Sequence, residues 1–203
     1  MSSKAKSGKK PANKSQQPLQ LRVIGGQWRS RKLHFPDLQG LRPTPDRVRE
    51  TLFNWLQNSV PAAQCLDLCA GSGALGIEAL SRGAKHCSFV DLAALSCRAL
   101  QENLNKLECT AAEVIQFDVI KWLEQSSGNQ QQSAVQYDIV FLDPPFGLNL
   151  CQNICQLLIE KNLLSSHAFV YVETEPSAQL SLPWTLHREK ISGQVRYRLY
   201  KVT

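Results

Sequence analysis

The apolar residues of this chain fall into short continuous runs that alternate with stretches of helical periodicity. The run Ile139-Val140-Phe141-Leu142, for example, is apolar at every position. Because a half-exposed strand alternates between polar and apolar residues, such runs indicate strands buried on both faces of a sheet. The expected strands cover residues 65–69, 86–91, 112–117, 137–142 and 168–173, and the expected helices cover residues 73–81, 95–107, 120–125 and 150–161.

Two further strands, at residues 184–190 and 194–202, show the alternation of a half-exposed sheet. Ser192-Gly193 lies between them, which predicts a tight turn and an antiparallel pair. Strands that alternate with helices in this order are typical of parallel sheets covered by helices. The pattern therefore predicts an α/β fold with a doubly wound, mostly parallel sheet of seven strands, one of which is reversed at the end.

The N-terminal part of the chain has a different character. Residues 1–18 are rich in Lys, Ser, Gln and Pro, which predicts a disordered basic tail. A short strand at 21–24 and a basic segment at 28–33, joined by Gly25-Gly26, predict a small hairpin. Thr44-Pro45 predicts a helix start, with threonine as the cap and proline at the first helical position.

These features predict one domain, from residue 19 to residue 203. Within it, residues 19–60 form an extension and residues 61–203 form the core. No segment has the length and hydropathy of a membrane span or of a secretion signal, so we expect a cytoplasmic protein. The seven cysteines show no paired spacing, and we expect reduced, buried thiols and no metal site.

Positive charge is concentrated at the N-terminus. Nine Lys and Arg side chains, and no Asp or Glu, occur in residues 1–33, although the whole chain has a formal charge of only +6. Such an arm is suited to nucleic-acid backbones, which it binds by releasing counterions without reading sequence. For residues 1–18 alone, a solubilising tail is an equal alternative.

A glycine-rich turn follows the first core strand, with Gly71 and Gly73 after Asp67. Ligands of doubly wound sheets bind beyond the carboxyl ends of the strands, and glycines allow the backbone to approach them closely. Gly71-x-Gly73-x-x-Gly76 alone also fits a dinucleotide site or tight helix packing. Asp67 favours a cationic ligand, because its carboxylate repels a pyrophosphate but accepts hydrogen bonds from an ammonium group.

Two more aspartates end the next strands. Asp91 stands where a carboxylate commonly binds the ribose hydroxyls of an adenosine ligand. Asp118 stands where a side-chain oxygen could accept from the adenine amino group, and an ordinary loop aspartate is the alternative there. The predicted cofactor-binding residues are Asp67, Ala70, Gly71, Ser72, Gly73, Asp91 and Asp118.

The most specific signal is Asp143-Pro144-Pro145-Phe146, directly after the strand at 137–142. Two prolines make this turn rigid. The Asp143 carboxylate and the Pro144 carbonyl then offer two acceptors for one NH₂ group, and Phe146 offers a ring face for the base that carries it. We predict these four residues as the catalytic turn.

These motifs resemble those of the class I methyltransferases that modify exocyclic amines through an (Asn/Asp)-Pro-Pro-aromatic turn. More narrowly, roughly residues 20–203 are similar to the bacterial small-subunit ribosomal RNA guanine-N2 methyltransferases of the RsmD type. The blocks that carry the similarity are VIGGQWRSRKL (23–33), LRPTPDRVRE (41–50), VFLDPPF (140–146) and RYRLY (196–200). One departure is Asp91-Leu92-Ala93, where such enzymes often carry Glu-x-Asp.

The resemblance implies a Rossmann-like fold, S-adenosylmethionine as cofactor, and a guanine N2 in 16S ribosomal RNA as target. It implies a substrate within an assembling small subunit, and we expect a monomer. The candidates for holding the RNA backbone are Arg29, Arg31, Lys32, Arg42, Arg47 and Arg49, although Arg47 and Arg49 could be solvated helix charges.

Other functions remain open at this point. The same turn serves adenine N6 or another nucleobase amine, and a glutamine-modifying protein methyltransferase is a weaker alternative because it leaves the basic arm without a purpose. A catalytically silent RNA-binding assembly factor is the main candidate from a different class, and the intact Asp67, Gly71, Gly73 and Asp143 argue against it. A nicotinamide oxidoreductase has no use for the proline turn.

Overall fold

The structure is a computed structural model that describes residues 19–38, 43–126, 135–145 and 150–202. Several predicted features lie outside these ranges. They are the basic tail at 1–18, most of the Ser/Gln-rich loop before residue 137, and the side chains of Arg42 and Phe146.

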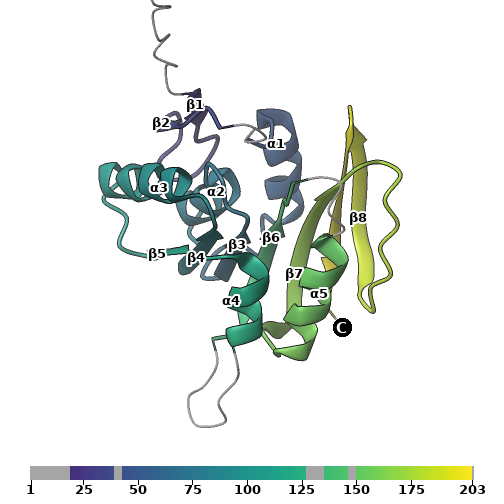
Figure 1. Cartoon of the computed structure of the whole chain (residues 1–203). Helices are drawn as coiled ribbons and strands as arrows, with labels where there is room; N and C mark the ends of the chain where they lie inside the picture. The colour runs from purple at the N-terminus through teal and green to yellow at the C-terminus, as the bar shows by residue number, and fades with distance from the viewer. Residues whose placement is uncertain (1–18, 39–42, 127–134, 146–149, 203) are drawn as a thin grey trace, which may run out of the picture.

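One seven-stranded sheet, in the order β5-β4-β3-β6-β7-β9-β8, forms the core of the protein (Figure 1). All neighbours from β5 to β7 are parallel, and β9 is antiparallel to both β7 and β8. The reversed strand is thus the last in the chain but lies inside the sheet. The core strands are β3 (Gln64–Leu68), β4 (His86–Asp91), β5 (Ala112–Gln116), β6 (Tyr137–Leu142), β7 (Leu164–Thr174), β8 (Thr185–Ser192) and β9 (Val195–Lys201).

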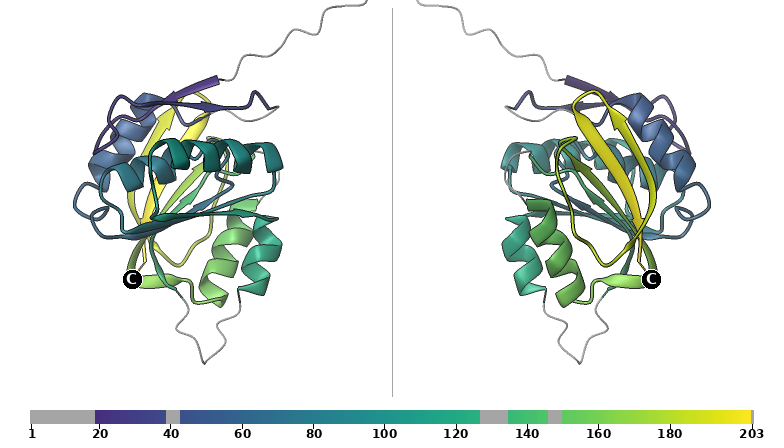
Figure 2. Two further views of the ribbon diagram at one scale, coloured as in Figure 1. Left: turned by 90° about the vertical axis from the view of Figure 1, so that its left-hand side faces the viewer. Right: turned by 90° about the vertical axis from the view of Figure 1, so that its right-hand side faces the viewer.

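Helices cover both faces of this sheet (Figure 2). One hydrophobic cluster contains residues of α1, α2 and α3, and the other contains residues of α4 and α5. Successive side chains along a strand point to opposite faces of the sheet, so Phe141 belongs to the first cluster and Leu142 to the second. The helices are α1 (Asp46–Trp55), α2 (Ala74–Ser81), α3 (Ala94–Lys106), α4 (Val119–Gln125) and α5 (Leu150–Glu160).

This architecture confirms the predicted α/β fold with its doubly wound, mostly parallel sheet. The strands at 86–91 and 137–142 have the predicted bounds, whereas β7 begins four residues earlier than expected. The early part of β7 contains Ser165, Ser166 and His167, whose polarity hides the strand from a search for apolar runs. None of the described helices is both long enough and apolar enough to cross a membrane.

The predicted N-terminal hairpin is present as β1 (Leu19–Arg22) and β2 (Lys32–Phe35). The first strand ends at Arg22, two residues before its predicted end. The backbone amides of Ile24 and Gly25 do not join the ladder. Both donate to the carboxylate of Glu78 in α2, over 2.8 Å each. The Glu78 carboxylate therefore ends β1 by binding these two amides. The local sequence of the hairpin does not reveal this contact.

Glu78 is fully buried and is the centre of a wider network. Arg82 Nε donates to Glu78 Oε1 over 2.8 Å, and Arg49 Nη1 lies 3.5 Å from Glu78 Oε2. Arg49 also donates to Asp46 over 2.7 Å and to the backbone oxygens of Arg22 and Thr44. The network fastens the hairpin and α1 to α2.

The expectation that Arg49 holds the RNA backbone is wrong. Its side chain is only 1 % exposed, and its guanidinium is occupied by Glu78, Asp46 and two carbonyl oxygens. A buried guanidinium with this many partners is structural, because extracting it would break its bonds to Asp46, Glu78 and two carbonyl oxygens together.

The predicted helix start is also corrected. The N-cap of α1 is Pro45, whose carbonyl accepts from the amides of Val48 and Arg49, and no side chain caps the helix. Thr44 is buried one position earlier, and its hydroxyl faces Asp143 instead of the helix. The residue expected to cap α1 therefore belongs to the site described below.

We expect Glu78→Gln to lower the free energy of unfolding by about 3 kcal/mol, because it removes the charge that compensates a buried arginine. Urea unfolding followed by tryptophan fluorescence measures this loss. The exposed Glu102→Gln in α3 is the matched control and should change little. Equal stability of the two variants would contradict a central role for Glu78.

Candidate active site

Three carboxyl groups come together at the carboxyl edge of the central strands. Asp67 lies near the end of β3, Asp143 directly follows β6, and Glu173 lies near the end of β7. Leu142 pairs with Val172, so Asp143 and Glu173 lie side by side, whereas Asp67 pairs with Phe141, two residues before Asp143. Because side chains alternate along a strand, all three point to the face that carries α1 and α2.

The loop between β3 and α2 has an unusual backbone. Cys69, Gly71 and Gly73 all have positive φ, at 61°, 54° and 72°. A Cβ atom on Gly73 would lie 2.4 Å from Leu100 Cδ1, so this glycine is required for packing against α3 as well as for its backbone conformation. Tight helix packing, one of the interpretations that the sequence left open, is therefore present at Gly73, and the approach of a ligand to this loop stays a prediction.

Asp67 is buried at the start of this loop and is only 4 % exposed. Its Oδ2 accepts from the amide of Gly76 in α2 over 2.9 Å. Burial, together with the charge of Asp91, raises the pKa of Asp67 to about 8 against the opposing effect of the Gly76 amide. This carboxyl group is therefore poised to become charged when a cation approaches.

Asp91, at the end of β4, supports the neighbouring loops. Its Oδ2 accepts from the amide of Gly71 and its Oδ1 from the amide of Ala93, both over 2.8 Å. The carboxylate lies next to the glycine turn, as the predicted ribose contact requires. Carboxylate oxygens have further lone pairs, so these two bonds leave acceptor capacity for a ligand.

Asp118 is the N-cap of α4, and its Oδ1 accepts from the amide of Lys121 over 3.0 Å. Capping occupies one oxygen of the side chain. A contact between the other oxygen and an adenine amino group remains a prediction.

Asp143 lies close to Thr44 and Glu173, neither of which the sequence predicted as a site residue. Thr44 Oγ1 is 3.4 Å from Asp143 Oδ2, and the Thr44 hydroxyl also lowers the pKa of Glu173. Burial raises the pKa of Asp143 well above its usual range, and the neighbouring Glu173 and Asp67 add to this rise.

Glu173 is the residue that sequence reasoning missed. It is 3 % exposed, and its Oε1 accepts from the Tyr171 hydroxyl over 2.8 Å. Burial also raises the pKa of Glu173, although the Tyr171 hydrogen bond opposes this. One signal was available: an acid at the end of an apolar strand, two residues after a tyrosine, on the strand beside the proline turn.

The remaining predicted site residues lie in the proline turn, on the N-terminal extension and in the loop between β3 and α2. Pro144 is buried and Pro145 is exposed at the same edge, next to Asp143. Arg29, Arg31, Lys32 and Arg47 are exposed. Arg31 donates to Lys106 O, and Arg47 donates to Ser192 Oγ. Ala70 and Ser72 are buried in the loop between β3 and α2.

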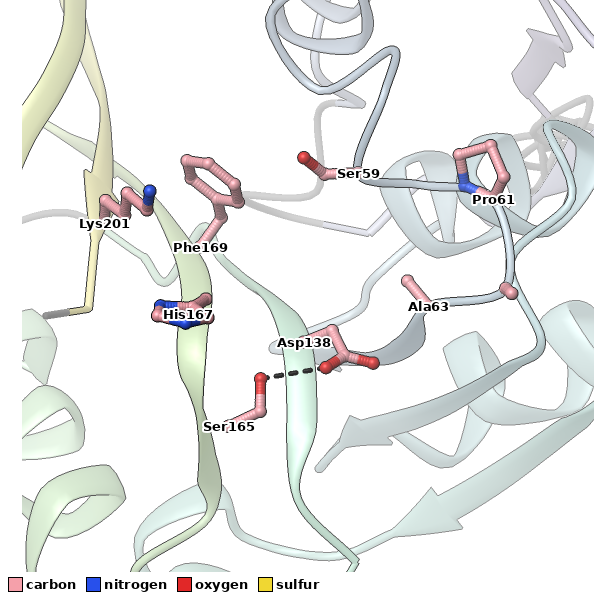
Figure 3. Close-up of a pocket in the computed structure, with 9 residues that line it drawn as sticks. Ser59, Pro61, Ala63, Asp138, Ser165, His167, Phe169 and Lys201 are labelled. Atoms are coloured by element: carbon pink, nitrogen blue, oxygen red, sulfur yellow. Dashed lines mark hydrogen bonds between the residues drawn. The ribbon is translucent and has the colours of Figure 1, made fainter.

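A cavity of about 420 Å³ lies at the opposite, amino edge of the sheet (Figure 3). Asp138, Ser165, His167 and Lys201 are among its lining residues. The Ser165 hydroxyl donates to Asp138 Oδ1 over 2.8 Å, and Asp138 also accepts from the amide of Gln64. Because these bonds tie β3, β6 and β7 together, Asp138 has a structural task, and this cavity is separate from the acidic edge.

Comparison with known proteins shows the family of this chain. The family described as conserved hypothetical protein 95 matches residues 21–201. The chain belongs to this family.

Two relatives are similar over nearly the whole chain. The ribosomal RNA small subunit methyltransferase D of Haemophilus influenzae is 47 % identical over 186 residues, which are 90 % of this chain and 94 % of that protein. The protein of the same name from Escherichia coli K12 is 46 % identical over 185 residues, 90 % of each.

Solved structures give the same result for the fold. The Escherichia coli protein yhhF is 45 % identical and has a TM-score of 0.81, with 90 % of this chain and 98 % of that chain covered. A hypothetical protein from Thermus thermophilus is 26 % identical with a TM-score of 0.75, covering 90 % and 99 %. These two structures thus share the fold of this chain.

We expect Asp67→Asn to stabilise the protein at alkaline pH. The pKa of Asp67 is raised from 3.8 to about 8 on folding, so stability from this group is present at low pH and is lost as pH rises through that window. The variant should therefore exceed the wild type by more than about 1 kcal/mol at about pH 8, and the difference should shrink towards about pH 5.

Urea unfolding at both pH values measures this difference, with the exposed Asp37→Asn as the control. A difference between Asp67→Asn and the wild type that does not change with pH would contradict the raised pKa.

Proposed function

We propose that this chain transfers a methyl group from S-adenosylmethionine to the exocyclic N2 of a guanine in 16S ribosomal RNA. The observation that carries the proposal is the rigid Asp143-Pro144-Pro145 turn beside the glycine loop, at one edge of one sheet. The relatives named ribosomal RNA small subunit methyltransferase D support the substrate class. The choice of guanine N2 rests on the sequence resemblance.

The residues at this edge fit the proposed cofactor. Asp67, Asp91 and Asp143 come from adjacent strands, and none of them has a salt bridge within the described part of the chain. This donor set suits a ligand with cationic groups and disfavours a pyrophosphate. Asp67 and the loop 70–73 would hold the amino-acid part, Asp91 the ribose, and Asp118 the adenine; when bound, S-adenosylmethionine supplies an activated methyl group.

The protein orients the target amine. Asp143 and the Pro144 carbonyl offer two acceptors, which position the two N–H bonds of the amine and leave its lone pair free. Such alignment is worth on the order of 7–11 kcal/mol in well-oriented reactions. The predicted face for the base, Phe146, lies outside the described residues.

Asp143 also stabilises the charge that develops on the nitrogen. Methylation leaves the nitrogen with one proton in excess, so an N–H bond breaks and an O–H bond forms on the Asp143 carboxylate, before the proton passes to water. A carboxylate in a buried site interacts strongly with this charge because little water screens it. A paired base cannot reach the turn, so the target guanine must be unpaired or flipped out of its helix.

The basic residues of the N-terminal extension would hold the RNA. Arg29, Arg31 and Lys32 lie on or beside the hairpin, and Arg47 lies on α1. Both elements are fastened to α2 through Glu78 and Arg49, so their charges stay in a fixed position relative to the glycine loop. Phosphate contacts would place the RNA without reading its sequence.

We expect Asp143→Ala to lower kcat at least about 100-fold, because it removes both an acceptor for the amine and the charge opposite the reacting nitrogen. The assay uses tritiated S-adenosylmethionine and small subunits from a strain that lacks the gene, followed by nucleoside analysis. Asp37→Ala is the control.

Label in N2-methylguanosine that disappears with Asp143→Ala supports the reaction and its site together. Label in another nucleoside overturns the guanine N2 target and keeps the amine chemistry. Absence of label in subunits, free RNA and DNA overturns the proposed function.

We expect Arg29→Ala to weaken RNA binding and to reduce the slope of log K against log salt by about 0.7–0.9 if it removes one phosphate contact. Lys85→Ala, on the exposed turn before β4, is the matched control because it removes a charge at the amino edge. Filter binding over a salt series compares the two. Equal slopes for both variants would remove Arg29 from the RNA-contacting surface.

A further inference from the structure

A second carboxyl group lies behind Asp143 on the same face of the sheet. Leu142 of β6 pairs with Val172 of β7 in parallel register, which makes Asp143 and Glu173 neighbours. Phe141 and Tyr171, two residues earlier, both belong to the cluster beneath α1. Asp143 and Glu173 therefore face the same side, where Thr44 lies.

The Thr44 hydroxyl connects the two carboxyl groups. Its Oγ1 is 3.4 Å from Asp143 Oδ2, and it lies close enough to Glu173 for its hydroxyl to lower the pKa of that carboxyl group. A hydroxyl has one proton to donate and lone pairs to accept with. When it bonds to both carboxyl groups at once, it donates to one and accepts from the other, so one of the two carboxyl groups carries a proton.

Tyr171 decides which group is charged. Its hydroxyl donates to Glu173 Oε1 over 2.8 Å, and a hydrogen bond of this kind stabilises a carboxylate. Before substrate binds, the arrangement is thus Asp143–OH donating to Thr44, and Thr44 donating to the Glu173 carboxylate. In this state, Asp143 cannot offer the charged acceptor that the target amine needs.

We propose that Thr44 and Glu173 form a proton relay that converts Asp143 into its carboxylate form when the target amine binds. This inference rests on the proposed function of Asp143. The Asp143 O–H bond breaks as its proton passes to Thr44 Oγ1, and the Thr44 O–H bond breaks as its own proton passes to Glu173. No charge leaves the buried site, and the net result is a neutral Glu173 beside a charged Asp143.

Thr44 and Glu173 are positioning residues in this scheme, because both act through Asp143. Their surroundings support one shared proton, since burial raises the pKa of both carboxyl groups and repulsion from Glu173 raises that of Asp143 further. The titratable or charged groups around the pair are Asp67 and Cys69 from the β3 end, Cys151 from α5, Tyr171 from β7, Tyr197 from β9, and Arg49, which binds the Thr44 backbone.

The pH dependence of kcat/KM distinguishes a relay from other roles for Glu173. In the wild type, the first proton that the pair loses as pH rises leaves Glu173. The relay then removes the proton from Asp143 when the amine binds. In Glu173→Gln, the proton must leave the buried Asp143 for solvent. The acid limb of the profile of kcat/KM against pH should therefore move up by about one pH unit. This shift lowers kcat/KM about ten-fold on the acid side of the profile.

Thr44→Val breaks the route and should move the acid limb in the same direction, whereas Thr44→Ser keeps a hydroxyl and should restore it. Asp143→Asn has no ionisable group at this position, and its profile records every other pH effect on the assay. A downward shift in Glu173→Gln would mean that Glu173 only repels the charge on Asp143. A uniform loss with an unmoved limb would mean a structural role. Either result overturns the relay.

A measurement without RNA separates failure of this inference from failure of the proposed function. ¹³C NMR of the labelled Asp143 and Glu173 carboxyl carbons in the free protein follows their titration. If the pair shares a proton, both carbons respond to both titration steps. If each carbon responds to one step only, the relay is wrong even when the wild type methylates RNA.

Discussion

A single buried carboxylate holds the N-terminal extension in the place where the site needs it. Glu78 of α2 binds the hairpin through the amides of Ile24 and Gly25, and it binds α1 through Arg49. Arg49 in turn donates to the backbone oxygen of Thr44, whose hydroxyl faces Asp143. The position of the site therefore depends on a charge network, and a buried charge is stable only while its partners remain in place.

The acidic edge follows from the topology of the sheet. Parallel strands bring their carboxyl ends to the same edge, so acids at the ends of β3, β6 and β7 lie close together. Burial raises the pKa of Asp67, Asp143 and Glu173, and repulsion from Glu173 and Asp67 raises that of Asp143 further. A cationic ligand and an amine are the species that such an edge accommodates best.

The charges of the protein are separated in a way that suits the proposed reaction. Exposed arginines and a lysine lie on the extension, whereas at the sheet edge Asp67 and Glu173 are buried and Asp143 is half-buried. In the proposed reaction, the exposed cations would attract the RNA backbone, and the sheet edge would accept the uncharged target base. The Glu78 network sets the distance between these two regions.

The sequence by itself determined the secondary structure of the core and its most specific motif. The strands at 86–91 and 137–142 were predictable because burial on both faces of a parallel sheet requires continuous apolar runs. The proline turn was predictable because the proline ring restricts the backbone locally. Only the tertiary structure decided the roles of Thr44, Arg49 and Glu173. Thr44 lies 99 residues from its partner Asp143, and no local pattern of hydrophobicity or capping records a hydrogen bond across that separation.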